Sequence, residues 1–183
     1  MVLNKIILGI DPGTSIMGYG VVKSGAKGPV LLDMGKIDLH KIKDPYKKLE
    51  RIFSETIMLI EKYKPTDLAI EAPFYGRNVQ SMLKLGRAQG TAISAAIYKS
   101  VEIFEYAPRK IKMSITGQGS ASKEQVSVML GNMLNFEILP KNLDATDGLA
   151  AAVCHYYQEK SPKITGGTKN WSEFLKNNPD RLI

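Results

Sequence analysis

The sequence has few residues that could form a disulfide or a zinc site. Its 183 residues include one cysteine and two histidines. A single cysteine cannot form an internal disulfide, and it excludes zinc sites built from cysteine pairs. No stretch approaches the roughly 20 apolar residues of a membrane span, and the N-terminus lacks the charged and then apolar layout of a secretory signal. We therefore expect a cytoplasmic protein with no membrane partner.

The composition is that of a packed domain, and its charge is unevenly distributed. Hydrophobic residues make up 44% of the chain, whose net charge is +7. Residues 76–123 hold eight Lys or Arg against two acids, whereas residues 124–159 hold one against five. A basic segment beside concentrated carboxylates suits a polyanionic substrate handled by a bound cation. An ordinary solvated surface explains the charge pattern equally well at this point.

Hydrophobic periodicity predicts an α/β domain. An antiparallel meander is expected from three strands, over residues 5–10, 17–22 and 30–39. Helices and strands then follow in turn: helix 45–63, strand 67–70, helix 79–99, strand 101–106, a short helix or turn 108–115, and helices 123–134 and 144–159. This order predicts a mixed five-stranded sheet with helices on both faces. We expect one domain over residues 1–159 and a basic C-terminal tail over 160–183, to which no function is assigned.

Four acids lie at the ends of predicted elements. Asp11 ends the first strand in GIDPGT, and Glu71 ends the strand 67–70. Asp144 and Asp147 are three residues apart at the start of a helix, so they share one face. Strand ends of an α/β sheet commonly line a ligand crevice, where converging carboxylates would repel one another. Mg²⁺ removes that conflict and prefers carboxylate, water and phosphate oxygens.

Each acid also has a purely structural explanation. Asp11 could make an Asx turn before Pro-Gly. Asp144 could cap its helix, with Asp147 favoured in the first turn by the helix dipole. Glu71 could pair with a nearby Lys or Arg. These explanations account for each residue separately but not for all four occurring at element ends.

Six motifs occur in an order that points to one family. They are GIDPGT, AIEAPFYGRN, SMLKLGRAQGTAISAAI, EYAPRKIK, GQGSASKEQV and DATDGLAAAVCH. From about residue 5 to about residue 157 the chain resembles the RuvC family of crossover-junction endonucleases, the bacterial Holliday junction resolvases. The resemblance implies a ribonuclease-H-like fold, in agreement with the element order. It also implies an endonuclease that resolves four-way DNA junctions by paired symmetric nicks in recombination and repair, leaving 5′-phosphate and 3′-hydroxyl ends.

The resemblance also implies roles for particular residues. It makes the four acids ligands of two Mg²⁺ ions per active site, with Mn²⁺ as a possible substitute. It implies that the positive charges of Lys112 and Lys123 assist catalysis. Both lysines are expected to contact the DNA as well. An aromatic residue that stacks on junction bases carries over to Phe74, with Tyr75 beside it. Further expected DNA contacts are Arg77, Lys84, Arg109 and Lys110.

The partners implied by the resemblance are the four-way junction, a second copy of the chain and the RuvA–RuvB branch-migration complex. The homodimer would pack through the helix 79–99, which is rich in small residues. Three other functions are weighed against this one. An actin-like ATPase or sugar kinase needs two lobes, and the chain has a single DPGT loop. A ribonuclease-H-like nuclease acting on RNA would suit the charge pattern equally, but Phe74, the pair Lys112 and Lys123 and the dimer-type helix argue against it. A non-catalytic DNA-binding module is the third, and the presence of all four acids argues against it.

Overall fold

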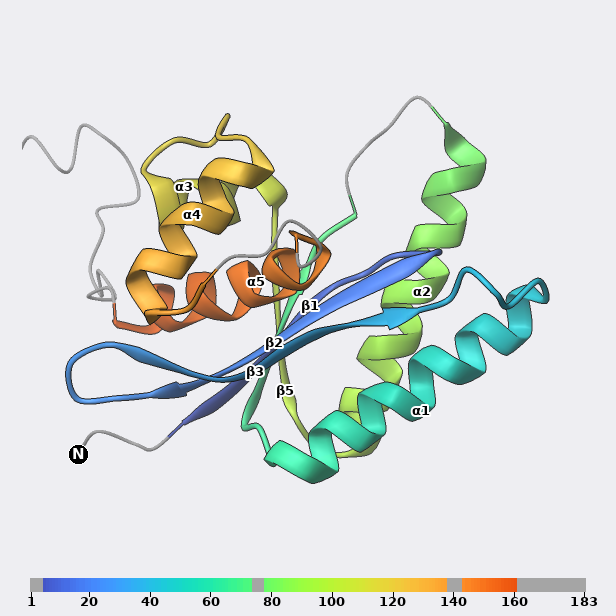
Figure 1. Ribbon diagram of the computed structural model, residues 1–183. Helices are drawn as coiled ribbons and strands as arrows, with labels where there is room; N and C mark the ends of the chain where they lie inside the picture. Colours follow the sequence, from blue (N-terminus) through green and yellow to red (C-terminus); the bar gives the residue numbers. More distant parts are fainter. Residues whose placement is uncertain (1–4, 74–77, 138–142, 161–183) are drawn as a thin grey trace, which may run out of the picture.

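A mixed five-stranded sheet forms the centre of the fold, seen in the computed structural model that describes residues 5–73, 78–137 and 143–160 (Figure 1). The strand order is β3-β2-β1-β4-β5. Pairing is antiparallel between β1 and β2 and between β2 and β3, and parallel between β1 and β4 and between β4 and β5. The strands are β1 (Ile6–Asp11), β2 (Ile16–Ser24), β3 (Pro29–Asp38), β4 (Asp67–Glu71) and β5 (Glu102–Tyr106). The predicted mixed sheet is confirmed.

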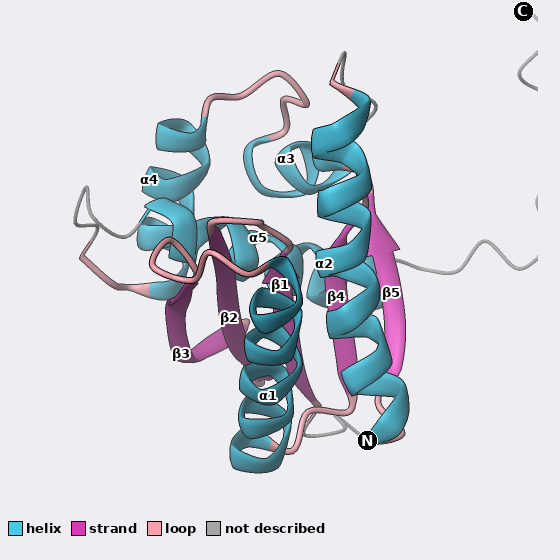
Figure 2. Ribbon diagram, turned by 90° about the vertical axis from the view of Figure 1, so that its right-hand side faces the viewer, coloured by secondary structure: helices cyan, strands magenta, loops and turns pink. Residues whose placement is uncertain are grey.

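Helices cover both faces of the sheet, as predicted (Figures 1 and 2). One face carries α1 (Pro45–Tyr63) and α2 (Val79–Tyr98), which pack against each other. The other carries α5 (Leu143–Lys160), which contacts β1 through β4, with α3 (Pro108–Thr116) and α4 (Lys123–Leu134) packed on it. Within the described residues, no helix is both long enough and apolar enough to cross a membrane.

Strand β1 separates two hydrophobic cores. Leu8 and Ile10 point into the core under α1 and α2, whereas Ile7 points into the core under α5. All three side chains are fully buried. Because successive side chains of a strand point to opposite faces, a central strand covered on both sides has to be apolar throughout. This explains the uninterrupted apolar run before Asp11.

The helix boundaries follow from local capping groups. Asp44 caps α1, its side chain accepting hydrogen bonds from the backbone N–H groups of Tyr46 and Lys47. Ser122 and Gln125 form a reciprocal capping box at the start of α4, which leaves fewer unsatisfied N–H groups there. Helix α5 begins at Leu143. Asp144 therefore lies inside the first turn, and the explanation of this acid as a helix cap is wrong.

Three glycines allow α5 to lie almost directly on the backbone of β2. A Cβ added at Gly20 would lie 2.6 Å from the Cβ of Leu149, and one at Gly148 would lie 2.6 Å from the carbonyl carbon of Gly18. A Cβ at Gly18 would in turn lie 3.0 Å from the carbonyl carbon of Asp144. Gly18 is also the cross-strand partner of Asp11. The start of α5 is therefore held beside the end of β1.

Replacement of Gly20 by alanine should destabilise the fold. The new methyl group would overlap the Cα and Cβ of Leu149, so α5 would have to move away from the sheet. We expect the free energy of unfolding to fall by about 1–3 kcal/mol, as for other overpacked cores. Urea denaturation, monitored by circular dichroism, measures this free energy. An unchanged midpoint would contradict so close a contact between α5 and β2.

Candidate active site

Five of the predicted site residues line one pocket of about 260 Å³. Asp11 ends β1, Glu71 ends β4, and Asp147 lies one turn into α5. Lys112 comes from α3 and Lys123 is the first residue of α4. The remaining lining includes apolar residues of α3, α4 and α5. The pocket thus combines three carboxylates and two ammonium groups from five different elements.

Parallel pairing of β1 with β4 brings the first two carboxylates together. Ile10 and Ile70 are paired in register, so the next residues, Asp11 and Glu71, end neighbouring strands at the same edge. The end of β4 is also tied to α2. The Nε2 of Gln89 donates to the Glu71 carbonyl oxygen at 3.3 Å and to Oε2 of Glu105 at 2.8 Å. Gln89 was not predicted as a site residue, because it lies among small residues in a helix and carries no sequence signal.

Burial and mutual repulsion disfavour the charged forms of the strand-end acids. Burial raises the pKa of Asp11 to about 7, and the charges of Asp147 and Asp144 add to the shift, against an opposing effect of Lys123. The pKa of Glu71 rises to about 8, chiefly through burial and then through the charges of Asp11 and Asp147. Both carboxyls therefore need a cation before they ionise fully at neutral pH.

Lys123 partly compensates this negative charge. Its ammonium forms an ion pair with the Asp147 carboxylate. Burial nevertheless leaves the pKa of Asp147 above its usual value. Burial lowers the pKa of Lys123, but the hydrogen bond to Asp147 and the charges of the nearby carboxylates together outweigh it, so the pKa of Lys123 is raised. The Lys112 ammonium donates to the Ala121 carbonyl at 2.8 Å. Its charge also opposes the rise in the pKa values of Glu71 and Asp147.

The fourth predicted acid, Asp144, is not among the residues lining the pocket. It lies one turn before Asp147 and is partly exposed. Its charge nevertheless raises the pKa values of Asp11 and Asp147. The structure thus places three acids in the wall of the pocket and the fourth beside it.

The other predicted DNA contacts lie outside this pocket. Lys84 lines a different pocket, described below. The Lys110 ammonium lies 5.2 Å from the centre of the Tyr106 ring, and the side chain of Arg109 lies over Gly119. Three further predicted contacts, Phe74, Tyr75 and Arg77, fall outside the described residues.

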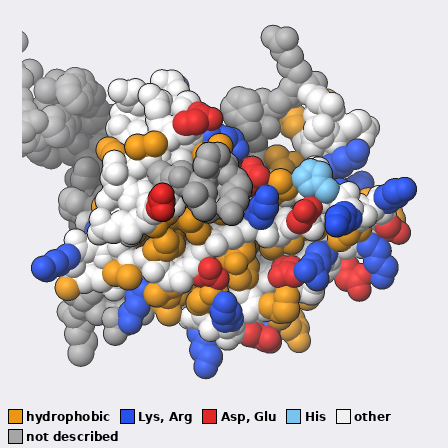
Figure 3. All heavy atoms as spheres, in the orientation of Figure 1, with side chains coloured by type: hydrophobic (Ala, Val, Ile, Leu, Met, Phe, Trp, Pro, Cys, Tyr) orange, Lys and Arg blue, Asp and Glu red, His pale blue; other side chains and the backbone are white. Residues whose placement is uncertain are grey.

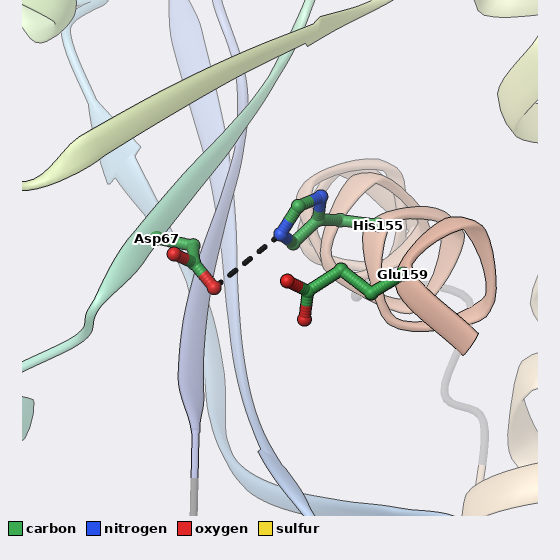
Figure 4. A group of neighbouring side chains, drawn as sticks. All are labelled: Asp67, His155 and Glu159. Atoms are coloured by element: carbon green, nitrogen blue, oxygen red, sulfur yellow. Dashed lines mark ion pairs between the residues drawn. The ribbon is translucent and has the colours of Figure 1, made fainter. Parts of the chain in front are cut away.

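A separate group of potential metal ligands lies at the other end of β4 (Figure 4). Among the residues that the structure describes, the ligand atoms of Asp67, His155 and Glu159 alone form a group of three within 4.8 Å of one another. Lys5 already pairs with both carboxylates, its Nζ lying 3.1 Å from Oδ2 of Asp67. The Tyr106 hydroxyl lies 2.7 Å from Nδ1 of His155. We interpret this group as a structural ion-pair network in which the protein supplies its own cation.

The strand order and the acids at the ends of β1 and β4 and on α5 define a ribonuclease-H-like protein. The model of the family described as "Crossover junction endodeoxyribonuclease RuvC" matches residues 7–155. The chain belongs to the RuvC family. A Christiangramia forsetii protein of that name is 56% identical over 97% of this chain and 93% of its own length. One from Bacteroides fragilis is 55% identical over 99% and 97%.

Solved structures agree with this fold. "T. thermophilus RuvC in complex with Holliday junction substrate" matches with a TM-score of 0.79 and 28% identity, over 85% of this chain and 95% of that one. The yeast mitochondrial Holliday junction resolvase Ydc2 matches with a TM-score of 0.63 and 13% identity, over 82% and 77%. At that identity the yeast protein supports the shared fold alone.

The raised pKa values predict how stability depends on pH in the presence of a chelator. Because the folded protein holds protons on Asp11 and Glu71 up to about pH 7 and 8, it binds more protons than the unfolded chain above about pH 4. Stability should therefore fall as the pH rises from 4 towards 8. Asp11→Asn should reduce this loss by about 1–3 kcal/mol. Urea denaturation between pH 4 and 8 measures the free energy of unfolding of both proteins. If that free energy changed with pH equally in wild type and Asp11→Asn, the raised pKa of the buried Asp11 would be contradicted.

Proposed function

We propose that this protein is a structure-selective endonuclease that resolves Holliday junctions by paired, symmetric, Mg²⁺-dependent nicks in recombination and repair. One observation carries the proposal: in a chain of the RuvC family, acids distant in sequence line one pocket and raise one another's pKa. The DNA substrate is supported by a solved RuvC complex with a Holliday junction. We place the activity in the bacterial cytoplasm.

The pocket suits a hard divalent cation. Its acidic ligands are all carboxylates, from Asp11, Glu71 and Asp147, with Asp144 beside them. Oxygen ligands of this kind are those that Mg²⁺ and Mn²⁺ prefer. The raised pKa values of the two strand-end acids reflect burial first and repulsion between the carboxylates second, and a cation would stabilise the charged forms against both. When bound, two Mg²⁺ ions would supply an activated water and stabilise the leaving 3′ oxygen, which gives 5′-phosphate and 3′-hydroxyl ends.

The two lysines of the pocket would act on the phosphate. Lys112 and Lys123 contribute positive charge to the same wall that holds the carboxylates. In a partly water-excluded pocket, such charges offset the negative charge that develops on a phosphate in the transition state.

We assign a base-stacking role to Phe74, with Tyr75 beside it, since such stacking contributes roughly 1–3 kcal/mol per base. Arg77, Arg109 and Lys110 are proposed as contacts to the DNA backbone.

A homodimer through α2 would match the substrate. The helix exposes Val79, Leu83 and Ile97 on one face. On the same face, a Cβ added at Gly86 or Gly90 would meet no atom of the described residues within 4 Å. Small residues let a second helix approach closely, and the exposed apolar side chains would be buried in the contact. A twofold dimer fits the approximate twofold symmetry of a four-way junction. It would present one pocket to each of two strands of like polarity. The RuvA–RuvB branch-migration complex is proposed as a further partner.

A cleavage panel tests the proposed function. A synthetic four-way junction, linear duplex DNA of the same sequence and a matching RNA are incubated with the protein in Mg²⁺ or in chelator. We expect paired nicks in the junction alone, and none in chelator. Cleavage of RNA in preference to the junction would instead support the ribonuclease alternative. Binding without cleavage in Mg²⁺ would support a non-catalytic module.

Asp144→Asn should abolish cleavage while junction binding is retained. Asparagine keeps the size of the side chain but removes the charge that Asp144 places beside Asp11 and Asp147. We expect the single-turnover cleavage rate to fall by at least about 100-fold, as for the loss of other electrostatic groups in active sites. Glu61→Gln removes one exposed acid on α1 and serves as the control. Cleavage by Asp144→Asn at the wild-type rate would exclude Asp144 from the site.

A further inference from the structure

A second pocket, the basic pocket, shares the β1–β2 turn with the pocket lined by Asp11, Glu71 and Asp147 (the carboxylate pocket), but its helical wall comes from α1 and α2, on the opposite face of the sheet. Asp11 stands at the start of this turn and lines the carboxylate pocket, whereas Thr14 and Ser15 stand at its end and line the basic pocket. The basic pocket has a volume of about 290 Å³. It is formed where the turn meets the beginning of α1 and the first half of α2. Its charged and hydroxyl-bearing wall consists of Thr14, Ser15, Lys43, Lys48, Lys84 and Arg87.

This wall carries four positive charges and no carboxylate. The acid next to it in sequence, Asp44, is already engaged. Its Oδ1 accepts hydrogen bonds from the backbone N–H groups of Tyr46 at 2.7 Å and Lys47 at 3.2 Å. It therefore caps α1 instead of forming an ion pair in the pocket. Because the cap satisfies the first turn of α1, the lysines and the arginine are the groups available to an anion.

The cations of the basic pocket differ from their neighbours on α1. Lys47 pairs with Glu50 at 2.7 Å, and Arg51 pairs with Glu55 at 2.5 Å. Figure 3 shows basic and acidic side chains interleaved on the side of the molecule where α1 begins. Within the part of the chain that the structure describes, Lys43, Lys84 and Arg87 form no ion pair, and Lys48 donates to the Thr14 carbonyl at 2.7 Å.

Like charges gathered around one pocket repel one another, and an external anion would remove that repulsion. Arg and Lys are the usual ligands of phosphate, Arg through a bidentate pair of hydrogen bonds. The hydroxyl groups of Thr14 and Ser15 add neutral donors. The wall of the basic pocket is therefore chemically suited to a phosphate group.

We propose that the basic pocket binds a backbone phosphate of the junction DNA while another phosphate of the same molecule lies at the carboxylate pocket. The inference rests on the proposed nuclease function and adds a second point of attachment to it. DNA is favoured over a free nucleotide because one turn of the chain contributes to both pockets. A polyanion lying across that turn can meet both. The second contact would fix the direction in which the DNA crosses the active site.

The test is the salt dependence of junction binding in chelator, where cleavage is blocked. Lys43→Gln combined with Arg87→Gln should raise the dissociation constant of the junction about tenfold or more near 0.1 M salt. It should also reduce the slope of log affinity against log salt by about 1–2, since each lost phosphate contact contributes about 0.9. The control is Lys23→Gln with Lys27→Gln, which removes the same charge at the opposite end of β2. The control should leave the slope unchanged.

The outcomes separate this inference from the proposed function. If wild-type protein neither binds nor cuts the junction, the proposed function itself fails. If wild-type protein does both, and the two double variants show equal slopes, the basic pocket contacts no phosphate and the inference is overturned. Arg87 lies on α2, the helix proposed to form the dimer, whereas Lys43 does not. Lys43→Gln alone therefore tests the phosphate contact without disturbing the dimer. It should reproduce about half of the change in slope, and no change would again overturn the inference.

Discussion

The close contact between α5 and the strands β1 and β2 is the constraint on which the candidate site depends. Glycines in β2 and α5 let the two backbones approach to a distance that any side chain would prevent. Gly18 is central, because it pairs with Asp11 across the strands and lies against the backbone of Asp144. One contact therefore stabilises the core under α5 and also places the acids of α5 beside the acid that ends β1.

Two charged clusters at opposite ends of β4 show how the protein treats buried acids in different ways. At Asp67 the carboxylate and its neighbour Glu159 share the ammonium of Lys5. At Glu71 no such partner is present among the described residues, and the pKa rises to about 8. Burial of a carboxylate is costly unless it is paired. In the first cluster, Lys5 of the chain itself neutralises the carboxylates. In the second, a bound cation would stabilise the charged form of the buried carboxylate.

Much of the fold was predictable, because it depends on local patterns. Apolar alternation and periodicity marked the strands and helices, and capping residues such as Ser122 marked a helix start. The element order predicted a mixed sheet, whereas the parallel pairing of β1 with β4 was seen only in the structure. The alternative explanation of Asp144 as a helix cap is wrong, because α5 begins one residue earlier, at Leu143. Gln89 was missed because its side chain, on α2, bonds to the backbone carbonyl of Glu71 at the end of β4. No sequence pattern reveals a contact of this kind between distant elements.

The sequence by itself determined which acids stand at element ends, and ordered motifs identified the family they belong to. Spacing along the chain sets such features, since a strand end or helix turn is a local property. Only the tertiary structure decided that Asp11, Glu71 and Asp147 share a wall, that Asp144 stands beside it and that Lys123 pairs with Asp147. It likewise decided that four cations line a second pocket, which shares the β1–β2 turn and has no carboxylate in its lining. Burial, repulsion and pKa depend on distances through space, which residues far apart in sequence acquire only when the chain packs.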